Sequence, residues 1–392
     1  MADKIRIIYL SSNLGIHDQR FLRKLVDAGY LVHLITHYPH MQLPDGINSL
    51  GLAEILQYEE PLAFSYGAGK YGFFSRKLRC WLAFLRSFVR FKKDIKRINP
   101  DLIHAGWVQN EGFLAALSGF KPWLLMPWGS DILINPNKSW RIRRKTKFTI
   151  SRADMIACDA ESVKQHIIEL SGYPAGKIVV FPWGVDLSHF NRKEVRLPLL
   201  SRLGWEGKKI LLMIRMFEPI YGIEYFIEAL PEIIRAEPDA RVILAGDGSL
   251  KGVLMQKASE MGLDNYVHFA GLIKNEDLPI YFNSANIYIS SSLSDGASLS
   301  LLEAMACGLP VVVSDVQSYY EWIKDGENGY IVPRRDPQLL AQRIIALLRD
   351  DNNRRRFGSK NLEIARQRAD WGKNFGKLEE IYRELVGIRN NA

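Results

Sequence analysis

Residues 287–314 read IYISSSLSDGASLSLLEAMACGLPVVVS. Two short apolar runs, Ile287–Ser290 and Val311–Ser314, enclose a helical pattern that Ser298 precedes and Gly308 follows. Serine is a favoured cap before a helix, and glycine is favoured just after one. The stretch therefore predicts a β-strand, an α-helix and a second β-strand, in that order.

The same alternation of short apolar runs and longer helical patterns continues in both directions along the chain. Uninterrupted apolar strands separated by helices are typical of parallel sheets covered on both faces. The runs fall into two sets, so we expect an α/β protein with two doubly wound, Rossmann-like domains. The expected strands are Ile5–Leu10, Leu31–Thr36, Leu102–Ala105, Trp123–Met126, Met155–Cys158, Ile178–Phe181, Ile210–Ile214, Val242–Ala245, Val267–Phe269, Ile287–Ser290, Val311–Ser314 and Tyr330–Val332.

A length of 392 residues suits two domains of roughly 150–200 residues each. The segment Pro182–Asp186 follows the last strand of the first set and marks the boundary. We expect a first domain over residues 1–187, a second over 188–370 and a final helix over 371–392. Ligands of such sheets bind beyond the carboxyl ends of the strands, so the loops there hold the candidate site residues.

The composition, with 47% hydrophobic and 24% charged residues, is that of a soluble globular protein. Three scattered cysteines without C-x-x-C spacing indicate a reducing compartment rather than a disulfide framework or a zinc site. Residues 1–10 are expected to form the first strand and not a signal peptide. No run of about 18 uncharged apolar residues is present, so we expect no membrane span and a cytoplasmic location.

Positive charge is concentrated in the first half of the chain. Residues 1–190 hold 25 basic and 16 acidic residues, whereas the remainder holds 27 of each. This asymmetry indicates an anionic partner for the first domain: a membrane surface, a lipid-linked phosphate or a nucleic acid. Because no recognition helix or aromatic-studded sheet motif is present, we rank nucleic acid last and expect none.

Residues 70–97 combine basic and apolar side chains at helical spacing. One face is basic and the other carries Trp and Phe, as expected of a helix at an anionic membrane surface. A domain helix with a buried apolar stripe and a solvated basic face explains the pattern equally well. The basic segment Trp140–Lys145 tilts the balance toward a peripheral membrane contact. The basic face consists of Arg79, Arg86, Arg90, Lys93 and Arg97. The apolar face consists of Leu78, Trp81, Leu85, Phe88 and Ile95.

Four loops at expected strand ends carry candidate binding groups. After the strand ending at Ser290, backbone amides before the helix suit a phosphate or sugar oxygen, and Glu303 suits a ribose diol. Arg215 and Gly246 follow two other strands, while Gly15 allows backbone to approach a phosphate. The alternatives are a capped turn with a surface glutamate, a structural salt bridge for Arg215 and simple turns at the glycines.

The segments 290–310, 311–315 and 325–330 together closely resemble the nucleotide-sugar site of glycosyltransferase family 4. The resemblance implies a GT-B fold, in which two Rossmann-like domains face a central cleft and the final helix returns to the first domain. It also implies transfer with retention of configuration, a UDP- or GDP-linked donor, and no metal or other cofactor.

On the donor side, the resemblance carries over to several positions. Asp295 would orient the transferred sugar, although the family more often has glutamate there, and Glu303, eight residues later, would hold the ribose. Arg215 would face the diphosphate, and Tyr221 stands where the family has a lysine, which removes a cation. Gly15 and Gly246 also fit the diphosphate side. The backbone amides expected at the donor are those of Gly296, Ala297, Ser298 and Leu299.

On the acceptor side, His17 or Asp18 would face the acceptor by resemblance, with an exposed turn histidine as the alternative for His17. Trp128 replaces a histidine that contacts the donor sugar in the family, and its indole could stack on a sugar face. Asp131 is a candidate for acceptor binding or for the base. Capping of the following helix is an equally good explanation for Asp131.

These residues predict a glycosyltransferase that acts on a glycan or lipid-linked acceptor, as in surface-polysaccharide or glycolipid synthesis. Two alternatives remain open. A nucleotide-sugar epimerase shares the architecture and would form product without an acceptor. A catalytically silent scaffold is favoured by the departures at Trp128 and Tyr221.

Overall fold

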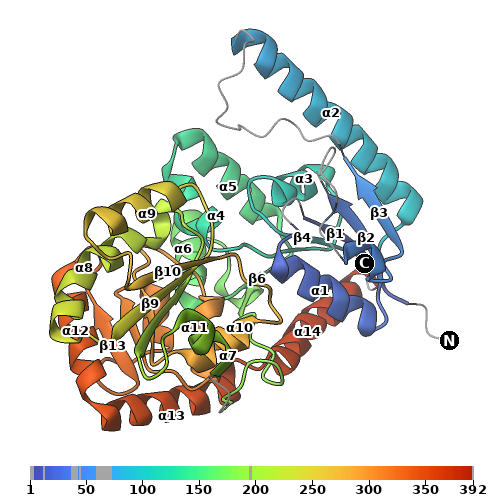
Figure 1. Cartoon of the computed structure of the whole chain (residues 1–392). Helices are drawn as coiled ribbons and strands as arrows, with labels where there is room; N and C mark the ends of the chain where they lie inside the picture. Colours follow the sequence, from blue (N-terminus) through green and yellow to red (C-terminus); the bar gives the residue numbers. More distant parts are fainter. Residues whose placement is uncertain are drawn as a thin grey trace. The chain divides into compact units, whose positions relative to one another are not determined.

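The computed structural model describes residues 4–11, 14–36, 43, 46–58, 73–193 and 197–390. The chain divides into two compact units. Unit 1 comprises Met1–Cys158, Val163–Val180 and Leu378–Ala392, and unit 2 comprises Asp159–Ser162 and Phe181–Lys377. Each unit is an α/β layer structure in which helices flank a sheet (Figure 1).

The sheet of unit 1 is entirely parallel and has the strand order β3-β2-β1-β4-β5-β6-β7. Its strands are β1 Arg6–Leu10, β2 Leu31–Thr36, β3 Glu54–Gln57, β4 Leu102–Ala105, β5 Trp123–Leu125, β6 Met155–Cys158 and β7 Ile178–Val180. The helices in this part of the chain are α1 Ile16–Asp27, α2 Phe73–Ile98, α3 Glu111–Ser118, α4 Ser130–Leu133, α5 Trp140–Arg152 and α6 Glu161–Ser171, with short 3-10 helices at Ile47–Ser49, Asn135–Asn137 and Ala175–Lys177.

The sheet of unit 2 is also parallel, with the order β10-β9-β8-β11-β12-β13. Its strands are β8 Lys209–Ile214, β9 Ala240–Ala245, β10 Val267–Gly271, β11 Ile287–Ser290, β12 Val311–Ser314 and β13 Gly329–Val332. The helices are α7 Leu197–Leu203, α8 Ile223–Ala236, α9 Lys251–Glu260, α10 Leu278–Ser284, α11 Leu299–Ala306, α12 Pro337–Arg349, α13 Asp351–Arg368 and α14 Trp371–Asn390, with 3-10 helices at Pro219–Tyr221 and Gln317–Glu321.

Two apolar clusters cover the two faces of the second sheet. One cluster joins the sheet to α8, α9 and α12, and the other joins it to α10, α11 and the end of α13. Strands such as β12, whose four residues are all buried, contribute side chains to both clusters. This two-sided burial explains why the strands of unit 2 read as continuous apolar runs.

All the strands expected from the apolar runs are present, and the two doubly wound sheets are confirmed. The prediction of six strands in the first set was incomplete, because β3 forms a seventh strand at the edge of that sheet. The short strand Glu54–Gln57 is only partly buried and is polar at both ends, so it lacks the apolar run that marks the others. Among the described helices, none combines the length and the apolar character that a bilayer crossing demands.

Helix α14 contributes residues to both units. Its Leu378–Asn390 portion belongs to unit 1, where Leu378, Tyr382 and Leu385 are fully buried. The Tyr382 hydroxyl lies 2.5 Å from His104 Nδ1 on β4. Burial without a second charge nearby lowers the pKa of His104 to about 3, so this histidine is neutral at physiological pH.

Candidate functional site

The carboxyl ends of three neighbouring strands in unit 2 bring the predicted donor residues together. Strands β8, β11 and β12 are consecutive in the sheet, so the loops that follow them share one edge. Arg215 follows β8 directly, and Asp295 and Ser298 lie in the loop after β11. Tyr319 lies in the 3-10 helix after β12. The contacts among these side chains form a polar cluster, which we call the Arg215 cluster.

Arg215 Nη2 is the centre of this cluster. It donates to the Asp295 carboxylate, to Ser298 Oγ and to the Tyr319 hydroxyl, the last at 2.8 Å. Tyr319 in turn donates to Asp295 Oδ2 at 2.9 Å. Ser290 Oγ lies 2.9 Å from the Tyr319 hydroxyl. Arg215 and Asp295 are therefore ion-paired, so the structure brings these two predicted residues together.

The cluster is largely shielded from solvent. The side chains of Arg215 and Asp295 are 10% and 15% exposed. Burial by itself lowers the pKa of Arg215, but Asp295 and the surrounding tyrosines raise it well above its usual value. The Tyr221 ring lies 5.2 Å from the Arg215 guanidinium carbon, a cation–π distance. Tyr221, which replaces the family's lysine, thus contacts the arginine with its ring face.

The turn before α11 presents backbone amides at the same edge. Ser298 caps α11 by accepting a hydrogen bond from the Leu301 amide at 3.3 Å, as the sequence predicted. The Ala297 amide donates to Asp159 Oδ2 at 2.9 Å. A Cβ atom on Gly296 would lie 2.7 Å from the same oxygen, so only glycine fits there without displacing Asp159. One of the four amides expected to contact the donor is therefore engaged by a carboxylate.

Glu303 lies in the second turn of α11 and is 4% exposed. The alternative that Glu303 is a surface glutamate is therefore wrong. Its charge contributes to raising the pKa of the Cys307 thiol to about 12, although burial of the thiol is the larger cause. Cys307 is consequently a neutral thiol, and Glu303 is a buried carboxylate one helical turn away from it.

Gly246 and Gly248 serve close backbone packing. A Cβ on Gly246 would lie 1.8 Å from the Arg215 carbonyl oxygen, and one on Gly248 would lie 2.6 Å from the Phe217 carbonyl oxygen. The Phe217 amide donates to the Asp247 carbonyl oxygen at 2.8 Å, which ties the two loops together. The geometry gives Gly246 a role in holding the loop that carries Arg215, and its contact with the donor stays a prediction.

In unit 1, the predicted residues after β1 belong to α1. Gly15 is the N-cap of α1 and provides no side-chain cap. Helix α1 starts at Ile16, directly after Gly15. His17 lies in the first turn of that helix, so the alternative of an exposed turn histidine is wrong. Its Nδ1 atom is buried and has no hydrogen-bond partner among the described residues.

Burial dominates the electrostatics of both residues. It lowers the pKa of His17 to about 4, with a smaller contribution from Arg20. It raises the pKa of Asp18 to about 6, against the opposing effect of hydrogen bonds that favour the ionised form. Asp18 Oδ1 accepts a hydrogen bond from the buried Tyr9 hydroxyl at 2.9 Å. His17 is therefore neutral at physiological pH, and Asp18 is held by the sheet beneath it.

Trp128 lies against the first turn of α1. Its ring centroid is 5.6 Å from that of His17, and its indole Nε1 is 2.8 Å from the position of a Cβ on Gly106. Gly106 follows β4, which lies between β1 and β5 in the sheet. Strand β1 leads to His17, and strand β5 leads to Trp128. The small residue leaves room for the indole, so unit 1 places an aromatic face and a neutral imidazole side by side.

Asp131 is fully buried and accepts backbone hydrogen bonds with both carboxylate oxygens. Oδ2 accepts from the Val108 amide and Oδ1 from the Trp128 amide, each at 3.0 Å. Burial nevertheless raises its pKa to about 6. The N-cap of the following helix is Gly129, so Asp131 does not cap that helix. The geometry favours a structural role, in which Asp131 joins two loops and holds the backbone of Trp128.

Sequence reasoning missed Tyr319, Ser290 and Asp159 as members of the site. Tyr319 carries no motif signal, and its distance from Arg215 along the chain exceeds 100 residues. Position after a strand was the one usable signal for Asp159, which directly follows β6. Within the described residues, no group of three or more His, Cys, Asp or Glu side chains is placed to hold a metal ion.

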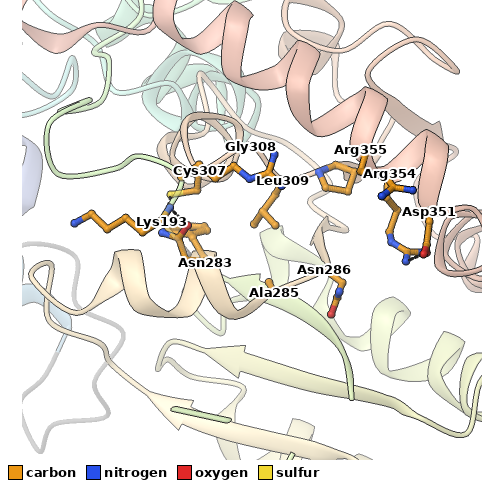
Figure 2. Close-up of a pocket in the computed structure, with 13 residues that line it drawn as sticks. Lys193, Asn283, Ala285, Asn286, Cys307, Gly308, Leu309, Asp351, Arg354 and Arg355 are labelled. Carbon is orange, nitrogen blue, oxygen red and sulfur yellow. Dashed lines mark hydrogen bonds and ion pairs between the residues drawn. The ribbon is translucent and has the colours of Figure 1, made fainter. Parts of the chain in front are cut away.

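A separate hollow of about 260 Å³ lies at the opposite edge of the second sheet (Figure 2). Its walls include Asn286, which precedes β11, and Pro310, which precedes β12. The Arg215 cluster follows those strands, and strands in a parallel sheet all run in one direction. The hollow is therefore distinct from the candidate donor site and shares none of its predicted residues.

Comparison with known proteins assigns the family. The family model "Glycosyl transferase 4-like" matches residues 6–160, and the model "Glycosyl transferases group 1" matches residues 200–363. The chain belongs to glycosyltransferase family 4. One model matches most of unit 1 of this family member, and the other matches most of unit 2. The match in unit 2 includes the strands and loops that build the Arg215 cluster.

Curated relatives of this family 4 member carry glycosyltransferase names. A phosphatidyl-myo-inositol mannosyltransferase from Mycobacterium leprae is 30% identical over 209 residues, which are 53% of this chain and 54% of the relative. A D-inositol 3-phosphate glycosyltransferase from Kineococcus radiotolerans is 27% identical over 258 residues, 61% of this chain and 59% of the relative. The matches thus span a little over half the length of these relatives.

Solved structures match the family 4 chain over nearly its whole length. HepE from Anabaena in complex with UDP has a TM-score of 0.80 at 19% identity and covers 98% of this chain and 100% of its own. Sucrose-phosphate synthase from Thermosynechococcus elongatus has a TM-score of 0.80 at 20% identity, with the same coverage. These likenesses, together with the two parallel sheets, establish the GT-B fold.

Proposed function

We propose that this chain transfers a sugar from a nucleoside-diphosphate donor to a glycan or lipid-linked acceptor, with retention of configuration and without a metal. The observation that carries the proposal is the Arg215 cluster. It gathers predicted donor residues at one sheet edge of a family 4 glycosyltransferase, beside the turn that precedes α11. Relatives that match half of the chain transfer sugars by name, and HepE is bound to UDP.

The donor would lie over the turn Asp295–Leu299 with its diphosphate toward the N-terminus of α11. Free amides and the partial positive charge of a helix N-terminus stabilise developing negative charge. Arg215 is largely neutralised by Asp295, so its part is to hold the Asp295 carboxylate and Ser298 in place. Its remaining positive potential would reach the diphosphate once the donor's oxygens compete with Asp295. Glu303 would accept hydrogen bonds from the ribose hydroxyls.

The acceptor would bind to unit 1. Trp128 offers an apolar ring face of the kind on which sugar rings stack, and neutral His17 offers a polar ring atom beside it. Asp18 and Asp131 would act through the positions of α1 and Trp128. A lipid-linked acceptor fits the name of the mycobacterial relative, which acts on a phosphatidyl-inositol.

A lipid-linked acceptor also fits a peripheral contact with an anionic membrane, which we include in the proposal. Helix α2 was the predicted contact. Residues 70–72 lie outside the described residues, as do the side chains of α2 up to Trp81, among them Leu78 and Arg79. Farther along α2, Arg97 pairs with Glu54 and Asp94, so part of its basic face is neutralised within unit 1.

Helix α5 is the stronger candidate for the membrane contact. Trp140 at its start is 63% exposed, and the guanidinium carbons of Arg141 and Arg144 lie 5.4 and 5.8 Å from its ring centroid. An exposed tryptophan surrounded by arginines suits the interface of an anionic bilayer, where the ring enters the headgroup region.

The test is a donor screen on the purified full chain. UDP- and GDP-linked sugars are incubated with a lipid extract as the acceptor, and products are followed by mass spectrometry in the presence of a chelator. Transfer to lipid with chelator present supports the proposal. An epimeric nucleotide sugar formed without acceptor would indicate an epimerase. Nucleotide binding without turnover would indicate a scaffold, and the absence of any binding would reject the proposal.

A further inference from the structure

The hollow at the amino ends of β11 and β12 is small, concave and lined by cations. Its volume of about 260 Å³ lies below the roughly 300–1,000 Å³ of sites for drug-sized ligands, so its ligand is small. The walls come from the ends of α10 and α11, from the first turn of α13 and from Arg192 and Lys193. The charged members of the lining are Arg192, Lys193, Asp351, Arg354 and Arg355.

The turn after α11 creates the space. Gly308 adopts a left-handed conformation with φ of 71°, which ends the helix and sends the chain into β12. A Cβ on Gly308 would lie 3.5 Å from Arg192 Cδ, so the stem of that arginine packs beside the turn. Arg355, in the first turn of α13, lines the hollow together with Leu309 of the same turn. Two arginines thus approach one short piece of backbone from different segments.

The charges of the hollow are only partly compensated. Arg354 pairs with Asp351, and its guanidinium also binds the Leu347 and Leu348 carbonyl oxygens at the end of α12. The other cations of the lining are Arg192, Lys193 and Arg355. No carboxylate of the described residues lies within ion-pair distance of these three side chains. In Figure 2, Lys193 points away from the centre of the hollow.

The neighbouring hollow shows the opposite arrangement. It shares Asp351 and Arg355 with the first and adds Lys209 and Arg349. Both added cations pair with Glu237, at 2.7 Å in each case. Lys209 and Arg349 are therefore neutralised, whereas Arg192 and Arg355 have no carboxylate partner among the described residues. A concave surface lined by one sign of charge concentrates counter-ions.

The polar residues of the floor do not compete for such an ion. Asn283 donates to the Asn191 and Pro279 carbonyl oxygens and accepts from the Lys193 amide. Asn286 Oδ1 accepts from the Ile210 amide at 2.6 Å. The Cys307 thiol is neutral, because burial raises its pKa to about 12. Arg355 also donates to Asn352 Oδ1 at 3.2 Å, which leaves its other guanidinium hydrogens for a ligand. The guanidinium groups of Arg192 and Arg355 match the geometry of phosphate oxygens.

We infer that this hollow binds a small phosphate-bearing anion through Arg192 and Arg355, at a site separate from the donor site. Inorganic phosphate, pyrophosphate and a sugar phosphate share the chemistry that the two guanidinium groups recognise. Because the site lies at the far end of β11, β12 and α11 from the Arg215 cluster, the anion does not compete with a nucleotide sugar for space.

The test uses the full chain and isothermal titration with pyrophosphate, inorganic phosphate and glucose 1-phosphate. The double variant Arg192→Gln/Arg355→Gln is compared with Arg366→Gln/Lys373→Gln, a charge-matched pair of exposed residues outside the hollow. We expect the first variant to bind pyrophosphate at least about tenfold more weakly than the wild type, and the second to bind it unchanged. Circular dichroism verifies that both variants fold.

The outcomes separate this inference from the proposed function. Wild-type chain that binds none of the three anions at millimolar concentration overturns the inference. Equal affinity in wild type and the Arg192/Arg355 variant places the anion elsewhere and also overturns it. Neither result bears on donor binding, which the screen above measures. Phosphate and glucose 1-phosphate of equal affinity would show recognition of the phosphate alone, whereas tighter glucose 1-phosphate would indicate a sugar phosphate as the ligand.

Discussion

Arg215 places one guanidinium nitrogen among three oxygens that come from two different loops. A buried ion pair of this kind contributes little net stability compared with apolar side chains, but the loss of one partner leaves an uncompensated charge. The pair therefore constrains the loop after β11 to one position relative to β8. That constraint is what a site needs if it must hold a sugar in a fixed orientation.

Replacement of Arg215 by leucine should lower the free energy of unfolding by about 3–5 kcal/mol, because Asp295 is left buried without its cation. The double variant Arg215→Leu/Asp295→Asn should recover part of the loss, since it removes the unpaired charge as well. Urea unfolding of the wild type, both single variants and the double variant measures the coupling. Additive single effects would show that the two side chains do not interact.

His17 gives a pH dependence of known sign. Its pKa of about 4 in the folded chain lies below the value of about 6.5 expected when unfolded. Between these values the unfolded chain takes up a proton that the folded chain does not, so the contribution of His17 to stability is present above pH 6.5 and lost as the pH falls toward 4. The loss amounts to at most about 3 kcal/mol.

The variant His17→Phe keeps an aromatic ring beside Trp128 but does not titrate. We expect the unfolding free energy of the wild type to fall relative to this variant as the pH is lowered from 6.5 to 4, in chemical denaturation measured at each pH. If the unfolding free energies of the two proteins change in parallel with pH, His17 has the same pKa in the folded and the unfolded chain. The pKa values of Asp18 and Asp131 are also raised in the folded chain. Both proteins contain these residues, so their contributions to the pH dependence cancel in the comparison.

At this scale the sequence singled out Arg215, Asp295 and Ser298, because each follows a strand or caps a helix. Glu303 was carried over from the family's motif. The sequence could not reveal that Arg215 and Asp295 neutralise each other, since their pairing depends on the neighbouring positions of β8 and β11. The position of Tyr319 depends on β12 in the same way. The sequence also could not reveal the two backbone partners of Asp131, whose role as a base stays a prediction.

Among the elements, the loop between β9 and α9 supports the loop that carries Arg215. Gly246→Ala should be severely destabilising, by more than about 3 kcal/mol, because the new Cβ would collide with the Arg215 carbonyl oxygen at a φ of 145°. Gly252→Ala, in the helix next to it, is the matched control. Nothing lies within 4 Å of its Cβ, so alanine should be neutral or stabilise by up to about 1 kcal/mol.

Thermal unfolding of the two alanine variants measures the difference. Similar melting temperatures would show that the loop relaxes around Gly246 and that the close approach is not required. The sequence indicated a turn at this glycine but gave no means of separating a phosphate contact from a backbone contact. That distinction depends on Arg215, whose carbonyl oxygen approaches Gly246 from another loop.

Element prediction succeeded where burial on both faces of a sheet imposes a continuous apolar run, as in β12. It failed for β3, whose partly buried edge position permits Glu54 and Gln57 at its ends. A simple turn was the alternative for Gly15, whereas it is the N-cap of α1.

For the whole molecule, the surplus of nine positive charges in residues 1–190 predicts salt-sensitive binding to anionic vesicles. The full chain should sediment with phosphatidylglycerol vesicles and not with phosphatidylcholine vesicles, and high salt should release it. Arg141→Glu/Arg144→Glu should weaken binding at least about tenfold, because each basic residue near the surface contributes about 1 kcal/mol. Arg366→Glu/Lys373→Glu, with the same charge change in unit 2, should bind as the wild type does.

Equal weakening in both vesicle variants would attribute binding to overall charge and not to α5. The charge asymmetry was visible in the sequence, as was the division into two sheets. The surface that bears the charge was not, because ion pairs such as Arg97 with Glu54 neutralise part of the predicted helix. The exposure of Trp140 became apparent only once α5 was placed.

The course of α14 has a consequence for biosynthesis. Unit 2 is nearly one continuous stretch of chain, whereas unit 1 needs Leu378, Tyr382 and Leu385 to fill its core. As the polypeptide leaves the ribosome, the core of unit 1 cannot be completed until this part of α14 has emerged. Nearly all of unit 2 emerges before that point, so unit 2 is free to fold before unit 1 is complete.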